Sequence, residues 1–505
     1  MKAGAILSRK YREHLLNNPY RPTYHFAISD DWGGPGDSNG AFFADGIYHL
    51  MYLYRNSNTE AYHWGHMTSM DLLHWRHHQD ALTTFEHDRG CFSGGGFVDE
   101  DGTAYISFWK FPSTFKDKDK GGIALAYSKP PYEVWERMEE VAVESSPIWG
   151  VTDIEVDGEI LHVGSADPSN IWKMNGKYYM QTGNKPVLDK FGRDEDSLDK
   201  YKGDFTDLFR SDDLKKWEYV GRFYDNNQKG IEDWPDETED DMCPSFLPLY
   251  DAEENGNPTG KYLQLFISHN RGCQYYIGTL DGEKFIPEQH GRMTWKDSAY
   301  FAPEALIDDK NRHIIWSWLR DNIRHDFKRF SWSGVFGVPR NVWYADGELK
   351  MAPIRELEKL EYNHIAYSKE DGENVKVGDG SACRIKGVWS GKEKAGLSVR
   401  VSDDGTEYAE IYYLPEEKKL VLDTRKCGLE GWRVYEQAPF ELREGEELSL
   451  DILIDKSVIE IYANNRQAIC RRAYPTNAEN SKGVKLIGEA PIKLDTYQMF
   501  PSNPY

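Results

Sequence analysis

The chain has 505 residues, 14% of them aromatic, and a formal net charge of −23 at pH 7. The aromatic content supplies a large hydrophobic core and excludes a wholly disordered chain, while the negative charge argues against nucleic acid or an anionic membrane surface as a partner. No stretch approaches the ~18 consecutive apolar residues of a transmembrane helix, and the N-terminus lacks the apolar segment of a secretory signal, so we expect a cytoplasmic protein.

A turn followed by a short strand rich in aromatic residues recurs along the chain after an N-terminal extension of residues 1–20. Gly- or Asn-containing turns before such runs are typical of β-hairpins. A second repeated unit, S-x-D-L-x-x-W, combines turn-forming Ser and Asp with a Trp that can close a small hairpin core. The strand units lie at 44–54, 100–109, 174–183, 256–268 and 309–319, and the second unit at 69–75 and 211–217.

Self-similar β-units at intervals of roughly 50–85 residues indicate radial repetition, which leaves only short, protected sheet edges. The five strand units therefore predict a five-bladed β-propeller over residues 21–352. A large irregular β-sandwich is the alternative that this pattern leaves open.

The composition changes after a short linker, residues 353–364. From residue 365 to 505 apolar and polar residues alternate with a period of two, as in LSLDILID and SVIEIYA. Such alternation with few helical stretches is typical of a β-sandwich. The predicted fold class is all-β, a five-bladed β-propeller followed by a C-terminal β-sandwich.

The cysteine and histidine patterns favour neither a disulfide framework nor a metal site. The six cysteines are widely spaced and form no C-x-x-C pair, which is typical of reduced, buried thiols. His63 and His66 flank Trp64 and are interpreted as packing or hydrogen-bonding residues. We expect no cofactor.

Carboxylates recur just before three of the strand units, where the inner ends of successive blades would converge. They are Asp37, Asp167 and an acidic cluster in 239–249. Taken singly, each Asp is more typical of a turn, and an acidic run such as 231–241 is more typical of a solvated surface. Together they recur at the same place in successive blades, as a convergent site requires. Paired carboxylates are the working parts of glycoside hydrolysis, and nearby aromatic faces are candidates for stacking on a sugar.

Five sequence blocks match, in the same order, the motifs of one enzyme family. They are YHWGHMTSMDLLHW (62–75), CFSGGGFVDEDG (91–102), ADPSNIWKMNGKYYM (166–180), WSGVFGVPRNVW (332–343) and IDKSVIEIYANN (454–465). The chain in these blocks resembles glycoside hydrolase family 32, the β-fructofuranosidase family of invertases, levanases and inulinases. The resemblance implies a propeller plus a sandwich, and cleavage of terminal β-fructofuranosyl residues from an oligosaccharide substrate by a retaining double displacement.

The resemblance also implies roles for individual residues. Asp37 corresponds to the nucleophile that attacks the anomeric carbon, and Asp167 to the carboxylate that stabilises the developing oxocarbenium ion. The subsite for the cleaved sugar would be lined by Trp32, Asn39, Trp64, Phe92 and Ser93.

The motifs depart from the family pattern where polar groups are expected. Two extra residues separate Trp32 from Asp37, and Ser38 replaces a Pro of the motif. Leu53 stands where the family usually has Gln, and Ala166 replaces an Arg. These changes argue against a plain sucrose-type subsite, because sugar hydroxyls left unpaired cost roughly 1–3 kcal/mol each.

The largest departure concerns the general acid/base. Met242 stands where the family has the acid/base Glu, and a thioether cannot donate a proton. The candidates for a displaced acid are Asp241, Asp240 and Glu304. The alternatives are a sugar-binding propeller without catalysis, and a family member that acts on another furanoside or as a transglycosylase. The substrate linkage, exo or endo action and the oligomeric state stay open.

Overall fold

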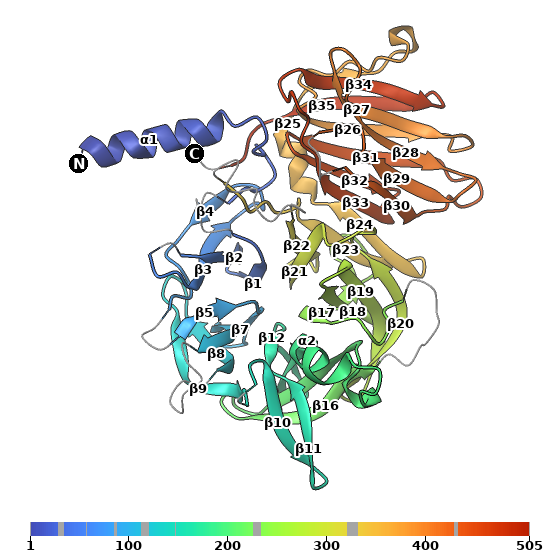
Figure 1. The fold of residues 1–505 in the computed structure, drawn as a ribbon. Coiled ribbons are helices and arrows are strands. Elements are labelled where there is room, and N and C mark those ends of the chain that lie inside the picture. Colours follow the sequence, from blue (N-terminus) through green and yellow to red (C-terminus); the bar gives the residue numbers. More distant parts are fainter. Residues whose placement is uncertain are drawn as a thin grey trace.

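The computed structural model describes residues 2–28, 35–56, 58–84, 88–112, 121–146, 148–225, 234–320, 332–428 and 433–503. Trp32 therefore lies outside the described residues. Helix α1 (Lys2–Leu16) precedes two successive all-β regions and projects from the side on which they meet (Figure 1). Within the described ranges, no helix has the length and apolar character needed to cross a membrane.

The first sheet contains two blade-like units. They are joined through one parallel residue pair, Tyr62 and Gly90, so each unit is an antiparallel sheet of its own. The strands are β1 (Ser38–Ala44), β2 (Ile47–Arg55), β3 (Tyr62–Ser69) and β4 (Trp75–His77), then β5 (Asp88–Phe92), β6 (Gly96–Val98), β7 (Ala104–Pro112), β8 (Gly122–Ser128) and β9 (Glu136–Glu144).

Three further antiparallel sheets continue the propeller, and Figure 1 shows all these units arranged around a common centre, consistent with five blades. The hairpin β10 (Val151–Val156) and β11 (Glu159–Gly164) precedes the third unit, which also carries the short helices α2 (Lys185–Val187), η1 (Leu188–Gly192) and η2 (Asp199–Tyr201). The third unit contains β12 (Ala166–Pro168), β13 (Trp172–Met174), β14 (Lys177–Gly183), β15 (Phe205–Ser211) and β16 (Trp217–Asp225). The fourth contains β17 (Met242–Tyr250), β18 (Pro258–Ser268), β19 (Gly272–Asp281) and β20 (Lys284–Arg292). The fifth contains β21 (Tyr300–Ile307), β22 (His313–Leu319), β23 (Arg340–Ala345) and β24 (Glu348–Pro353).

The repeated S-x-D-L-x-x-W unit is a turn that closes a hairpin. In the first copy Asp71 Oδ1 accepts hydrogen bonds from the amides of Leu73 and His74, at 3.1 and 2.9 Å. In the second copy Asp213 Oδ1 accepts from the amides two and three residues further on, at 2.9 and 3.0 Å. The Leu after each Asp has a left-handed φ, 63° and 64°, and the final Trp begins β4 or β16.

The second region is a sandwich of two antiparallel sheets around its own apolar core. Its first strand, β25, lies partly within the segment 353–364, after the 3-10 helix η3 (Arg355–Leu360); the 3-10 helix η4 (Lys369–Asp371) follows. One sheet has the order β25 (Glu361–Ala366), β35 (Lys493–Met499), β26 (Ala382–Trp389), β31 (Leu448–Asp455), β32 (Val458–Ala463) and β33 (Gln467–Arg472); the other has β30 (Tyr435–Pro439), β29 (Lys419–Asp423), β28 (Ala409–Leu414), β27 (Ala395–Ser402) and β34 (Ser481–Gly488).

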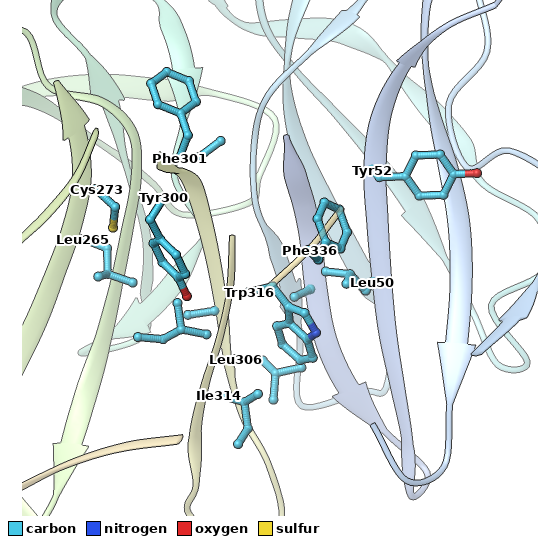
Figure 2. Close-up of a cluster of buried hydrophobic side chains, with 14 of the residues drawn as sticks. Leu50, Tyr52, Leu265, Cys273, Tyr300, Phe301, Leu306, Ile314, Trp316 and Phe336 are labelled. Atoms are coloured by element: carbon cyan, nitrogen blue, oxygen red, sulfur yellow. The ribbon is translucent and has the colours of Figure 1, made fainter. Parts of the chain in front are cut away.

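The propeller core includes apolar side chains from adjacent blades. Leu50 of β2, Leu306 of β21 and Trp316 of β22 belong to one buried cluster, part of which is drawn in Figure 2. Burial of such side chains stabilises the fold by about 1.5–3 kcal/mol each. Figure 2 also shows that Tyr300 and Phe301 leave β21 in opposite directions, as alternation along a strand requires.

The segment that enters the propeller is fixed to the sandwich by two buried carboxylates. Asp455, at the end of β31, accepts hydrogen bonds from the amides of Thr23, Tyr24 and His25, each at 2.7 Å. The His25 ring lies 3.2 Å from Asp455 and 3.5 Å from Glu460. Burial opposes the charge of the ring, but these two carboxylates prevail and raise the pKa of His25 to about 9.

The interaction of His25 with Asp455 and Glu460 predicts that the free energy of unfolding falls as pH rises. Because the pKa is raised in the folded state from 6.5 to about 9, the stabilisation is complete below about pH 6.5 and is lost as pH rises through about 9; it amounts to about 3 kcal/mol. We expect the unfolding temperature of the parent to fall over this range and that of His25→Gln to change less. Parallel unfolding curves of the two proteins across the range would contradict the assignment.

Candidate active site

Asp37 lies immediately before β1, at the inner end of the first blade. Its Oδ2 accepts a hydrogen bond from Ser93 Oγ at 2.5 Å, and its carbonyl accepts one from the amide of Leu53 at 2.9 Å. Burial raises the pKa of Asp37, while the bond from Ser93 and the positive charges of Arg320 and His269 oppose the shift. The carboxylate is therefore held in place by Ser93, in surroundings that favour its neutral form.

Asp167, in β12, faces Asp37 from the third blade. Burial and then the charge of Asp37 raise the pKa of Asp167 to about 7. Its Oδ2 accepts a hydrogen bond from Cys243 Sγ at 3.4 Å, and burial together with Asp167 raises the pKa of that thiol, which stays protonated as a donor. The structure thus brings together two carboxyl groups that are about 130 positions apart in the sequence.

A backbone bulge near the start of the inner strand recurs in four blades and turns side chains toward this site. The inner strands of four blades are interrupted by register shifts near their first residues. A residue with left-handed φ lies at or beside each interruption: Gly40 at 57°, Asp167 at 37°, Cys243 at 46° and Ala302 at 47°. Such bulges re-aim side chains next to active sites, and the three non-glycine cases store backbone strain.

The end of the acidic run is buried, which corrects the expectation of a solvated surface for residues 239–241. Each carboxylate of this segment finds its own partners on neighbouring strands. Glu239 Oε2 accepts hydrogen bonds from Ser268 Oγ at 2.7 Å and Gln274 Nε2 at 3.0 Å. The segment leads directly into β17, where blade packing encloses it.

Asp241 is fully buried and is bound by groups other than Asp37 and Asp167. Its Oδ2 accepts a hydrogen bond from Tyr224 at 2.9 Å, and its amide donates to Asn184 Oδ1 at 2.8 Å. Burial and the adjacent Asp204 raise the pKa of Asp241 well above its ordinary value. The hydrogen bonds of Asp241 therefore join it to Tyr224 and Asn184 and not to Asp37.

Glu304 is buried further along the propeller centre than Asp37. Its Oε1 accepts hydrogen bonds from the amides of Ala41 at 2.9 Å and Gly96 at 3.3 Å. Ala41 lies four positions beyond Asp37 along β1, so Glu304 sits behind the site. Burial raises the pKa of Glu304 well above its ordinary value, and the hydrogen bonds from the two amides oppose that shift.

Asp240 is held by a histidine that the sequence motifs did not indicate. Asp240 Oδ2 accepts a hydrogen bond from His269 Nδ1 at 2.6 Å. His269 follows the last residue of β18, and its charge acts on both Asp37 and Asp167. Asp240 is therefore connected to the site through the imidazole ring.

Some of the predicted sugar-contacting residues lie at the site, and others hold the site's loops in place from behind. Ser93 contacts Asp37, and Asn39 fixes the loop of Ser93 by accepting a hydrogen bond from the Gly94 amide at 3.2 Å. Trp64 is fully buried, and its Nε1 donates to the carbonyl of Phe92 at 3.2 Å. Trp64 therefore supports the site from behind and presents no face to a sugar.

Sequence reasoning also missed Arg320 and Phe301. The Arg320 guanidinium lies 4.4 Å from the centre of the Phe301 ring, and its charge opposes protonation of Asp37. Phe301 lies near the start of β21, in a segment that matches the family pattern but was searched only for carboxylates, and Arg320 directly follows β22, where no motif marked it. Among the described residues, no group of three or more His, Cys, Asp or Glu side chains is arranged to hold a metal ion.

Comparison with known proteins supports the family resemblance of the sequence. The family model "Glycosyl hydrolases family 32 N-terminal domain" matches residues 25–353, and "Glycosyl hydrolases family 32 C terminal" matches residues 356–498. A fructan 6-exohydrolase of Beta vulgaris is 25% identical, over 92% of this chain and 83% of that protein. A raffinose invertase of Escherichia coli is 25% identical, over 94% of each chain.

The fold agrees with a solved structure of a related enzyme. The crystal structure of fructan 1-exohydrolase IIa from Cichorium intybus superposes with a TM-score of 0.77 at 19% identity, covering 96% of this chain and 98% of that chain; a second structure of that enzyme is a complex with 1-kestose. Because the two family models together span nearly all of it, the chain belongs to glycosyl hydrolases family 32 and is a glycosidase.

Proposed function

We propose that the protein hydrolyses terminal β-fructofuranosyl residues of oligosaccharides by a retaining double displacement, with Asp37 as nucleophile and Asp167 as stabiliser. The observation that carries the proposal is the pair of facing carboxyl groups, one fixed by Ser93 and the other by Cys243. A carboxylate nucleophile at the anomeric carbon is one working part of retaining glycoside hydrolysis, and a second negative charge beside the sugar stabilises the oxocarbenium-like transition state. Family membership favours this function over sugar binding without catalysis.

Each residue would have a separate task in the first step. Asp37 carboxylate forms a bond to the anomeric carbon while the bond to the leaving oxygen breaks. Asp167 holds negative charge beside the sugar as positive charge develops on it, and such charge contributes most where water is excluded. Ser93 keeps the attacking carboxylate in one orientation, which lowers the entropy cost of reaction.

A substrate panel with parallel calorimetry tests the function. We expect release of fructose from β-linked fructosyl oligosaccharides and from an aryl β-fructofuranoside. Leu53 and Ala166 replace polar groups of the family's motifs and are buried, so we also propose that plain sucrose is a poorer substrate than other β-fructofuranosides. Binding without turnover of any furanoside would contradict the proposal, and turnover of only a different furanoside or only transfer to another sugar would redirect it.

The six cysteines support a reducing location. All six are buried free thiols, as is usual in cytoplasmic proteins. We propose that the enzyme acts in the cytoplasm on oligosaccharides small enough to be imported.

The raised pKa of Asp167 predicts the low-pH limb of activity. Asp167 must be ionised to stabilise positive charge, and its pKa is about 7, so kcat/KM for an aryl β-fructofuranoside should fall as pH drops below about 7. Cys243→Ala removes a hydrogen bond that favours the ionised form and should move this limb to higher pH. A limb near the ordinary carboxyl value of about 4, unmoved in Cys243→Ala, would contradict the prediction.

A further inference from the structure

His269 and Asp240 form a pair in which a buried carboxylate orients a half-exposed ring. Nδ1 of His269 donates to Asp240 Oδ2 at 2.6 Å, and the His269 amide donates to Asp240 Oδ1 at 3.3 Å. The Asp240 side chain is 4% exposed and the His269 side chain 44% exposed. Because Nδ1 is engaged, the proton available for exchange is on Nε2, for which the described part of the chain offers no hydrogen-bond partner.

A chain of ring contacts connects His269 to Gly36, the residue before Asp37. The His269 ring meets the Phe301 ring edge-on, with 5.7 Å between centroids, and Phe301 contacts Trp318 at 6.3 Å. The Trp318 ring in turn packs on Gly36, where an added Cβ would be 3.2 Å from it. Gly36 directly precedes Asp37, and Phe301 is the residue that points away from Tyr300 in Figure 2.

The other candidates for a proton donor are engaged elsewhere. Met242 has no exchangeable proton, and its Sδ accepts the amide of Lys185 at 3.4 Å. Asp241 is bound to Tyr224, and Glu304 is bound to two amides behind the site. Both oxygens of Asp240 accept hydrogen bonds from His269, whose charge acts on Asp37 and Asp167.

We propose that His269 is the general acid/base of this enzyme and that Asp240 is its positioning residue, replacing the glutamate whose place Met242 occupies. The proposal rests on the proposed function, because it names the donor for the same reaction. An imidazole suits the task because its two nitrogens can each carry a proton, so that a carboxylate on Nδ1 fixes its tautomer and orientation while Nε2 gives or takes the proton.

The proton that His269 gives up in the first step returns to it in the second. In the first, the Asp37 oxygen bonds to the anomeric carbon, the bond to the leaving oxygen breaks, and that oxygen takes the proton from Nε2 of the His269 imidazolium. In the second, neutral Nε2 removes a proton from water, the water oxygen bonds to the anomeric carbon, and the ester bond to Asp37 breaks. The cycle restores the Asp37 carboxylate and the His269 imidazolium.

The test compares substrates whose leaving groups differ in their need for a proton. In His269→Gln, kcat/KM for a β-fructosyl oligosaccharide should fall by about 100-fold or more, while kcat/KM for p-nitrophenyl β-fructofuranoside should fall by less than about 10-fold. Azide, which needs no base, should accelerate turnover of the aryl substrate by His269→Gln and yield fructosyl azide, with no such gain for the parent. Asp240→Asn should show the same substrate split, more weakly.

His364 provides a matched control in the sandwich. Its ring lies 2.7 Å from Asp495 and is 51% exposed, against 8% for that carboxylate, so His364→Gln breaks an equivalent pair and should behave as the parent does. Unfolding temperatures of all variants check the fold.

Three results would overturn the assignment of the acid. They are parent-like cleavage of the oligosaccharide by His269→Gln, an equal loss on both substrates without azide rescue, and a far larger substrate split in Asp240→Asn than in His269→Gln. If Asp37→Asn is inactive on both substrates while His269→Gln matches the parent, the hydrolase function stands and only the acid is wrong. If the parent cleaves neither substrate, the proposed function itself fails.

Discussion

Asp37→Asn is expected to lower kcat by roughly 10⁴-fold or more on both an oligosaccharide and an aryl β-fructofuranoside. The amide keeps the size of the side chain but has no charged oxygen to attack the anomeric carbon. Its oxygen still accepts the hydrogen bond from Ser93, so the fold and the affinity for sugar should stay close to those of the parent. Initial rates on both substrates and calorimetric affinities measure the two effects.

The loss on the aryl substrate separates this variant from a variant of the acid. A good leaving group needs no proton but still needs a nucleophile. Asp212→Asn is the control, because Asp212 is a surface carboxylate, 78% exposed, that pairs with Lys177. Activity of Asp37→Asn within about 10-fold of the parent on the aryl substrate would exclude Asp37 as nucleophile.

Asp167→Asn is expected to lower kcat by about 10²–10³-fold on both substrates. The amide can still accept the hydrogen bond from Cys243, but it cannot place negative charge beside the oxocarbenium ion. KM should change little, because the charge matters most in the transition state. A drop in kcat/KM that comes only from KM would contradict this role.

The same substitution should stabilise the fold at high pH. Burial and Asp37 raise the pKa of Asp167 from 3.8 to about 7. A raised carboxyl pKa means that the ionised form is costly in the folded state, so the parent loses stability as pH rises from about 4 to about 7, by about 4 kcal/mol. Asp167→Asn lacks this loss and should unfold at a higher temperature than the parent at pH 8, and at no higher temperature near pH 4.

The fold was largely predictable because its signals are local and repeated. The S-x-D-L-x-x-W units predicted turns, and Asp71 and Asp213 make the same pair of amide bonds in each. The change to a two-residue period after the linker predicted the sandwich. The family resemblance is confirmed by the two family models, which cover the propeller and the sandwich.

The site was predictable only in part, since position along the chain does not determine which way a side chain points. Asp37 directly precedes β1 and Asp167 lies in β12, both at the inner ends of their blades, and the structure brings them together. Trp64 lies in an equally well matched block, yet packing against the second blade buries it completely.

The acid could not be located from sequence for two physical reasons. The chain enters β17 so that neighbouring residues face different partners: Asp240 meets His269, and Asp241 meets Tyr224. His269 comes from the turn after β18, in a segment without a motif, and only the register of β17 against β18 brings it beside Asp240.

Capture of the fructosyl intermediate by methanol tests the central claim most directly. The parent is incubated with an aryl β-fructofuranoside in buffer containing methanol, and the methyl fructoside formed first is identified by NMR. Two inversions at the anomeric carbon through an Asp37 ester predict methyl β-fructofuranoside, and Asp37→Asn should form none. Formation of the α-anomer by the parent, or of the β-anomer by Asp37→Asn at the parent's rate, would contradict a retaining mechanism through Asp37.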